Sequence, residues 1–175
     1  IQEVVSCKRA VEKYIPQIME TIDKILETEY EDQLAYNLTM DYVVSLLFSL
    51  FRVIFKENFD IQKYMPLMLG IMPSTTESLE AANTYMNLVF LCGEYPNLMS
   101  HFAPETVRIL SQTFALKEKE WGTINLPTDI AQSMAILLQN LLNSMQQGNE
   151  ILAVSVPDEM AMQRFQQRFS SFLPA

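Results

Sequence analysis

The chain has 175 residues, of which 49% are hydrophobic, 19% are charged and only four are glycine. This composition supplies apolar material for a continuous core and disfavours a protein made of sheets and tight turns. The net charge of −9 disfavours direct binding to nucleic acid, because phosphate binding needs clustered lysine and arginine. It suits basic protein partners instead.

The first residues have the pattern of helices joined by short connectors. Residues 1–12 predict the end of one helix. Residues 14–29 predict the next, because isoleucines recur at helical spacing along one side. Residues 31–37 are polar and predict a connector between this helix and the one that follows.

Residues 38–56 are apolar almost throughout. A helix that is apolar on all sides is typically enclosed by neighbouring helices. We expect no membrane insertion here, because the uncharged stretch between Asp41 and Arg52 is shorter than the ~18 residues that a membrane span requires.

The rest of the chain continues as helices with stop and start signals between them. Pro73 ends one helix, and the capping-box arrangement Ser74–Glu77 starts the next. The longest predicted break is Lys117–Leu126. Pro127 then opens a helix that Gly148–Asn149 ends. The helices predicted in this part are residues 60–72, 77–94, 103–116, 127–147 and 157–172, with a connector over 95–100.

A seven-residue phrase occurs twice in the chain. Lys13–Met19 reads KYIPQIM, and Lys63–Leu69 reads KYMPLML. Weaker echoes follow at His101–Pro104 and Ser155–Pro157. Each phrase contains a proline and is followed by a helical pattern, and proline is tolerated in a first helical turn.

A helical unit that recurs every ~40–47 residues is typical of HEAT and armadillo repeats. We therefore expect an all-α fold, a HEAT/armadillo-like α-solenoid of about four antiparallel helix pairs. Residues 1–175 are expected to form a single solenoid segment. Because the chain starts at Ile1 rather than at methionine, we expect this segment to belong to a longer chain, and the family resemblance given below implies that it is the C-terminal part.

Three stretches follow one another in an order that has a counterpart in a known family. They are Tyr64–Pro73, Glu77–Ala82 and Leu88–Cys92, and they read as a proline-containing helix, an acidic connector and an apolar helix. Together with the last helix, which begins at Pro157, they resemble the C-terminal repeats of importin-β-like karyopherins. The likeness is greatest to the large importins that carry ribosomal proteins and histones.

This resemblance implies a nuclear transport receptor fragment that binds protein cargo non-covalently for Ran-dependent nuclear import. The GTPase Ran would bind mainly to N-terminal repeats that are absent from this segment. Phenylalanine–glycine nucleoporins are possible partners, in clefts such as one between 38–56 and 77–94. The receptor would shuttle between cytoplasm and nucleus, without enzymatic activity.

Other classes of protein fit the same sequence. A HEAT-repeat scaffold subunit of a phosphatase or chromosome complex would have the same fold without coupling to Ran. An export receptor would have both the fold and the coupling. A compact helical-bundle enzyme or lipid carrier would share only the helical composition.

The predicted cargo-binding residues are Glu20, Asp23 and Glu27. Their spacing of three and four residues places them on one face of a helix. The resemblance implies that this helix lines the concave side of the solenoid, where carboxylates can bind lysine- and arginine-rich cargo. The alternative is a solvated helix face opposite the apolar side.

The remaining reactive side chains show no catalytic or metal-binding pattern. His101 has no partner at a telling spacing, and the acidic run Glu27–Asp32 lacks the glycine and ligand spacing of a calcium loop. Cys7 and Cys92 imply a reducing compartment. Trp121 is expected to pin its connector to the core. We expect no catalytic residue, cofactor or metal site.

Overall fold

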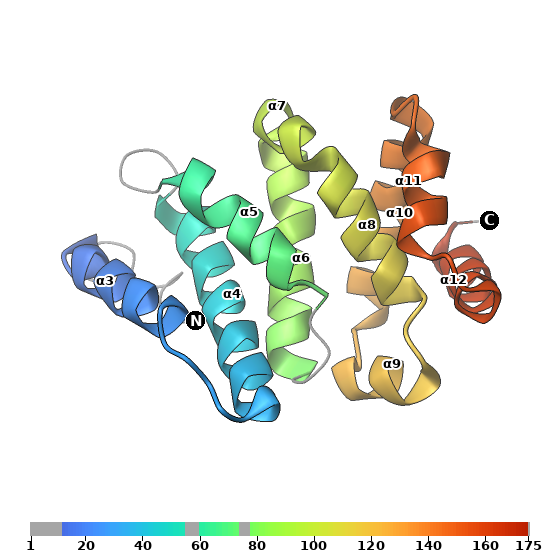
Figure 1. The fold of residues 1–175 in the computed structure, drawn as a ribbon. Coiled ribbons are helices and arrows are strands. Elements are labelled where there is room, and N and C mark those ends of the chain that lie inside the picture. Colours follow the sequence, from blue (N-terminus) through green and yellow to red (C-terminus); the bar gives the residue numbers. More distant parts are fainter. Residues whose placement is uncertain (1–11, 55–59, 74–77, 175) are drawn as a thin grey trace.

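The computed structural model describes residues 12–54, 60–73 and 78–174 (Figure 1). Within these residues all regular structure is helical and no strand occurs, so the predicted all-α class is confirmed. The predictions for residues 1–11, which include Cys7, and for the capping box at 74–77 lie outside the described part. The described helices are α3 (Ile15–Leu26), α4 (Gln33–Ile54), α5 (Ile61–Ile71), α6 (Ser78–Glu94), α7 (Pro96–Met99), η1 (Ser100–Phe102), α8 (Ala103–Phe114), α9 (Glu118–Ile124), α10 (Thr128–Ser144), α11 (Gly148–Ser155) and α12 (Glu159–Phe172).

The longer helices lie in two layers (Figure 1). The first layer contains α4, α6 and α10, which lie side by side: α4 contacts α6, and α6 contacts α10. The second layer contains α3, α5, α8 and α11, with α8 in contact with both α5 and α11. Helices of the first layer run in one direction and those of the second layer run the opposite way, so each helix of the second layer returns the chain across the stack.

A single apolar core fills the space between the two layers. Fully buried side chains come from both layers, including Phe48 of α4, Tyr85 of α6, Phe114 of α8 and Leu138 of α10. α4 and α6 each have neighbours on several sides, which explains why their sequences are apolar around most of the helix.

α4 begins earlier than the sequence predicts. The polar residues Gln33–Asn37 form its first turn, although they were expected to be a connector. The backbone N–H of Leu34 donates to Asp32 Oδ1 (2.9 Å), and Gln33 Nε2 donates to Asn37 Oδ1 (2.9 Å). The bond to Asp32 satisfies a backbone N–H that would otherwise be unpaired at the start of the helix, and the second bond joins two side chains one turn apart.

By length and composition α4 could also cross a membrane, since Gln33–Val53 has a mean hydropathy of 1.4. The uncharged stretch between Asp41 and Arg52 is short, as noted from the sequence, but the helix that contains it extends back to Gln33 and is long enough to span a bilayer. Core helices of globular proteins pass the same test, and 56% of the apolar window in α4 is buried against the rest of the chain. Burial of this kind accounts for the apolar composition without a bilayer.

The repeated proline phrase does not mark equivalent positions in the helices. Pro16 and Pro104 lie in the first turns of α3 and α8, as predicted. Pro66 lies inside α5, which begins after Asp60, where the backbone N–H of Lys63 donates to the Asp60 carboxylate (3.1 Å). The expectation that each proline leads its helix is therefore wrong for α5.

Three short helical segments, formed by α7 with η1, by α9 and by α11, occupy stretches predicted as connectors. α7 and η1 lie within residues 95–102, and α9 occupies most of the predicted break at Lys117–Leu126. α9 begins where the backbone N–H of Lys117 donates to Glu120 Oε2 (3.0 Å). The third, α11, starts at Gly148, which was expected to end a helix.

Gly148 is required by a close backbone approach. A Cβ atom at this position would lie 2.9 Å from the Leu142 carbonyl oxygen and 3.0 Å from its Cα. We expect Gly148→Ala to lower the free energy of unfolding by ~1–3 kcal/mol, because main-chain atoms of α10 must move to admit the methyl group. Urea unfolding monitored by circular dichroism measures this change.

Gly122→Ala is the matched control. A Cβ atom at Gly122, inside α9, would meet nothing within 4 Å, so alanine there should raise stability by up to ~1 kcal/mol through its higher helix propensity. Equal effects of the two substitutions would show that α10 and α11 do not approach each other as described.

Candidate binding surface

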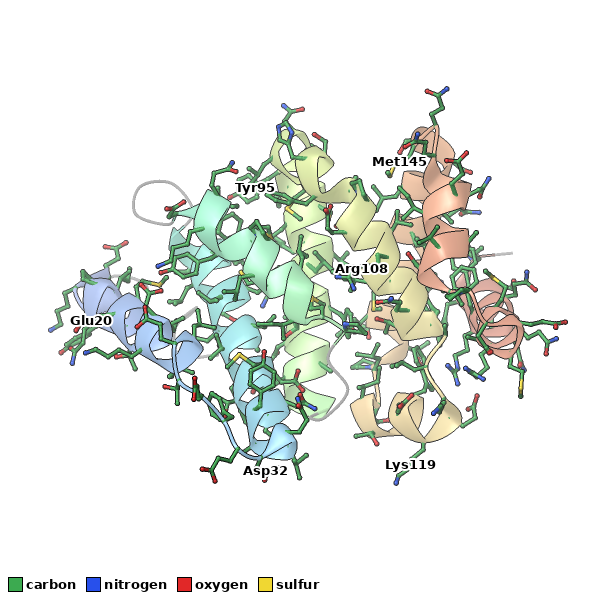
Figure 2. The ribbon with its side chains drawn as sticks, in the orientation of Figure 1. Glu20, Asp32, Tyr95, Arg108, Lys119 and Met145 are labelled. Carbon is green, nitrogen blue, oxygen red and sulfur yellow. The ribbon has the colours of Figure 1, made fainter. Side chains whose placement is uncertain are left out.

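The predicted stripe of carboxylates lies along α3. Glu20 is exposed, and its Oε1 accepts from Lys24 Nζ at 2.7 Å. Glu27 is exposed at the C-terminal end of the helix. Figure 2 shows Glu20 at the edge of the molecule, on a helix that has the rest of the stack on one side only. Two of the three residues therefore face solvent.

Asp23 accepts hydrogen bonds from other residues of the chain. Its carboxylate accepts from Lys63 Nζ at 2.8 and 2.7 Å and from the Tyr64 hydroxyl at 2.8 Å. Both partners belong to α5, and Tyr64 is buried. These hydrogen bonds join α3 to α5, so the charge of Asp23 is matched by its neighbour in the second layer.

The same contacts change the titration of all three groups. Hydrogen bonds from Lys63 and then Tyr64 lower the pKa of Asp23. The bond to Asp23 raises the pKa of Lys63, whereas burial is the main reason that the pKa of Tyr64 is raised. The side chains of Lys63 and Asp23 remain 49% and 36% exposed, so solvent and salt screen the pair and its contribution to stability is small.

We expect Asp23→Asn to reduce the pH dependence of stability. The folded pKa of Asp23 lies below the unfolded value of ~3.9, so its contribution is present above that value and is lost as pH falls through the folded pKa. The difference in urea midpoint between wild type and variant should therefore be largest near neutral pH and should shrink in acid. A difference that stays constant across this range would contradict the assigned pair. Glu20→Gln, on the same helix, serves as the exposed control.

Arginines also join helices that are distant in sequence. The guanidinium of Arg108 on α8 donates to the Leu69 and Met72 carbonyls at the end of α5. On α12, Arg164 donates to the Ala115 carbonyl (2.9 Å), and Arg168 donates to the carbonyl oxygens of Phe114 (3.0 Å) and Leu116. In both cases a cation satisfies the unpaired carbonyls at the C-terminal end of the preceding helix and opposes its dipole.

A groove runs between α8 and α11 in the same layer, with a volume of about 440 Å³. Two exposed carboxylates, Glu105 and Glu150, belong to the first turns of these helices. At its other end Gln112 Nε2 donates to the Ser155 carbonyl (3.4 Å). The side chains that line the groove are Pro104, Glu105, Arg108, Gln147, Glu150, Ile151, Val154 and Ser155.

A second groove, of about 490 Å³, lies between α3 and α4. Its lining is mainly apolar and includes Ile18, Ile25, Tyr42 and Leu46. Among the residues that the structure describes, no acidic or basic side chain lines it. This groove therefore offers contact area but little chemical selectivity.

A buried polar seam joins α4 to α6. Asn87 Nδ2 donates to Ser49 Oγ (3.3 Å), and Arg52 donates to Asn87 Oδ1 (3.3 Å) while lying 4.3 Å above the Phe90 ring. Asp41 and Glu80 are also buried. The sequence analysis missed the seam, although Ser49 and Arg52 lie three residues apart and so share one face of α4. The seam specifies how the two helices pair and is not open to a ligand.

The other candidate residues have structural surroundings. His101 is exposed on η1. Cys92 packs against the core, and burial raises the pKa of its thiol to about 12, so it stays protonated and unreactive near neutral pH. Trp121 packs against Phe114 and Phe172, with ring centroids 5.9 and 6.1 Å apart, which confirms that it pins its segment to the core. In the described part of the chain no three His, Cys, Asp or Glu side chains gather as metal ligands would.

Comparison of the chain with protein-family models, curated proteins and solved structures gives no match.

Proposed function

We propose that the chain is a segment of a HEAT-like α-solenoid that binds a protein partner without catalysing a reaction. The two-layer arrangement supports this proposal, because helices contact their neighbours in the stack. The arginine contacts that join α5 to α8 and α8 to α12 add a recurring link between units. Stacks of this kind bind along extended surfaces and change curvature at modest cost.

The proposed role is that of a nuclear transport receptor which carries basic protein cargo and is controlled by Ran. The observation that supports a basic cargo is the net charge of −9, together with exposed carboxylates on α3, α8 and α11. Such a surface attracts lysine- and arginine-rich proteins and orients them during encounter. Ran would act mainly through N-terminal repeats, phenylalanine–glycine nucleoporins are further partners, and the receptor would shuttle between cytoplasm and nucleus without inserting into membranes.

The test uses the full-length protein that contains this segment. It is immobilised and loaded with a histone or ribosomal protein, and the retained cargo is measured with and without Ran-GTP. Import predicts release that requires Ran-GTP, whereas retention that requires Ran-GTP indicates an export receptor. Cargo binding that is the same with and without Ran-GTP indicates a scaffold. If no basic protein binds, the proposal as a whole is contradicted.

A further inference from the structure

We propose that the groove between α8 and α11 binds an extended protein segment in which a lysine or arginine lies next to an apolar side chain. This inference rests on the proposed function and gives it a location. It differs from the prediction made from the α3 stripe, where Asp23 is already paired with Lys63.

The acidic end of the groove supplies the site for the cation. Glu105 and Glu150 lie in the first turns of α8 and α11, and Figure 1 shows that these two helices begin at the same end of the stack. Both side chains are exposed. Among the described residues neither carboxylate takes part in an ion pair. A cation that enters here meets two carboxylates that no described lysine or arginine pairs with.

The rest of the groove supplies the apolar contact. Val154 on α11 is 81% exposed, the highest value among the large hydrophobic side chains of the described chain. Ile151, one turn earlier on the same helix, and Pro104 also line the groove. An isolated exposed valine is ordinary, but one that lines a concave surface beside two carboxylates can contact an apolar side chain there.

Arg108 does not convert the groove into an anion site. Its guanidinium extends from α8 toward α5 (Figure 2) and donates to the Leu69 and Met72 carbonyls and to Gln112 Oε1 (2.9 Å). The carbonyls at a helix end carry partial negative charge that offsets part of the charge of this cation. The groove has two carboxylates at one end and one arginine whose guanidinium is bonded to α5, which suits a basic segment better than an acidic one.

The experiment measures binding of a short fluorescent peptide with lysines on both sides of one leucine to the full chain, by fluorescence anisotropy at low salt. Glu105→Gln with Glu150→Gln is expected to weaken binding about tenfold, because two rim charges are lost. Val154→Ser is expected to weaken it by about two- to fivefold through lost apolar contact. The matched control, Glu29→Gln with Glu31→Gln, removes the same charge from exposed positions between α3 and α4 and should change affinity less than twofold.

The outcomes separate the groove from the proposed function. Equal losses from the two double variants would mean a general charge effect and would overturn the groove proposal, as would a loss confined to the control variant. In both cases basic cargo would still bind the full-length receptor. If the wild-type protein binds neither the peptide nor any basic protein, the proposed function itself is wrong. The affinity for a peptide with serine in place of leucine should not change in Val154→Ser. Unchanged melting temperatures would show that the variants remain folded.

Discussion

Phe114→Ala is expected to lower the free energy of unfolding by ~3–5 kcal/mol, the usual cost of removing a buried aromatic ring and leaving a cavity. Phe114 is completely buried at the end of α8. Its ring contacts Trp121 of α9 and both Phe169 and Phe172 of α12. One side chain thus holds three helices together, and these neighbours cannot all collapse into the space that it leaves.

Denaturant unfolding measures the loss, and Trp121, the only tryptophan, reports it locally. Its emission should shift to longer wavelength in Phe114→Ala, because the vacated space admits water to the ring. Phe114→Leu keeps most of the volume and should cost less, ~1–2 kcal/mol. Met160→Ala, at an exposed position on α12, should be nearly neutral. A Phe114→Ala protein as stable as wild type would contradict the packing of α9 and α12 on α8.

Arg168→Met is expected to lower the free energy of unfolding by ~2–4 kcal/mol. Arg168 is buried, and its guanidinium donates to the Phe114 and Leu116 carbonyls and to Glu118 while lying over the Trp121 ring. Methionine keeps the apolar stem of the side chain but leaves the carbonyls at the end of α8 without donors. Acceptors that are left buried and unpaired cost ~1–3 kcal/mol each, with compensation from whatever water can reach them.

Two further variants divide this effect into its parts. Glu118→Gln should cost less than ~1 kcal/mol, because the Glu118 side chain is 81% exposed and pairs of that kind contribute little. Arg168→Lys keeps the charge but cannot reach several acceptors at once, so it should lie between wild type and methionine. If Glu118→Gln were as damaging as Arg168→Met, the ion pair rather than the carbonyl contacts would hold α12. Because Arg168 and Phe114 have shared neighbours, their effects should not add.

Most of the helical order could be predicted from periodicity and local signals. α5 was predicted within a residue or two, because Asp60 caps its start and Pro73 follows its end. α9 and α11 were not predicted, since both are short and depend on contacts made after folding. Trp121 anchors α9 to Phe114, and Gly148 allows α11 to approach α10. Neither contact can be predicted from the local sequence.

The candidate surface was predictable only in part. The spacing of Glu20, Asp23 and Glu27 correctly placed them on one helix, α3 with its C-cap. Nothing in the sequence near Asp23 indicated that Lys63 and Tyr64 would donate hydrogen bonds to its carboxylate. Arg108 and Arg168 carry no local signal of their contacts, since each caps a helix distant in sequence. The α8/α11 groove was missed because α11 itself was missed. The assignment of cargo to any of these surfaces remains a prediction.

Small-angle X-ray scattering of the isolated chain most directly tests the proposal that helix pairs stack in file. A compact domain of this length has a radius of gyration of ~16 Å. The stacked arrangement predicts a value clearly above this and a distance distribution with a long tail toward large separations. A radius near ~16 Å with a symmetric distribution would indicate a compact bundle and would contradict the solenoid on which the proposed binding function rests.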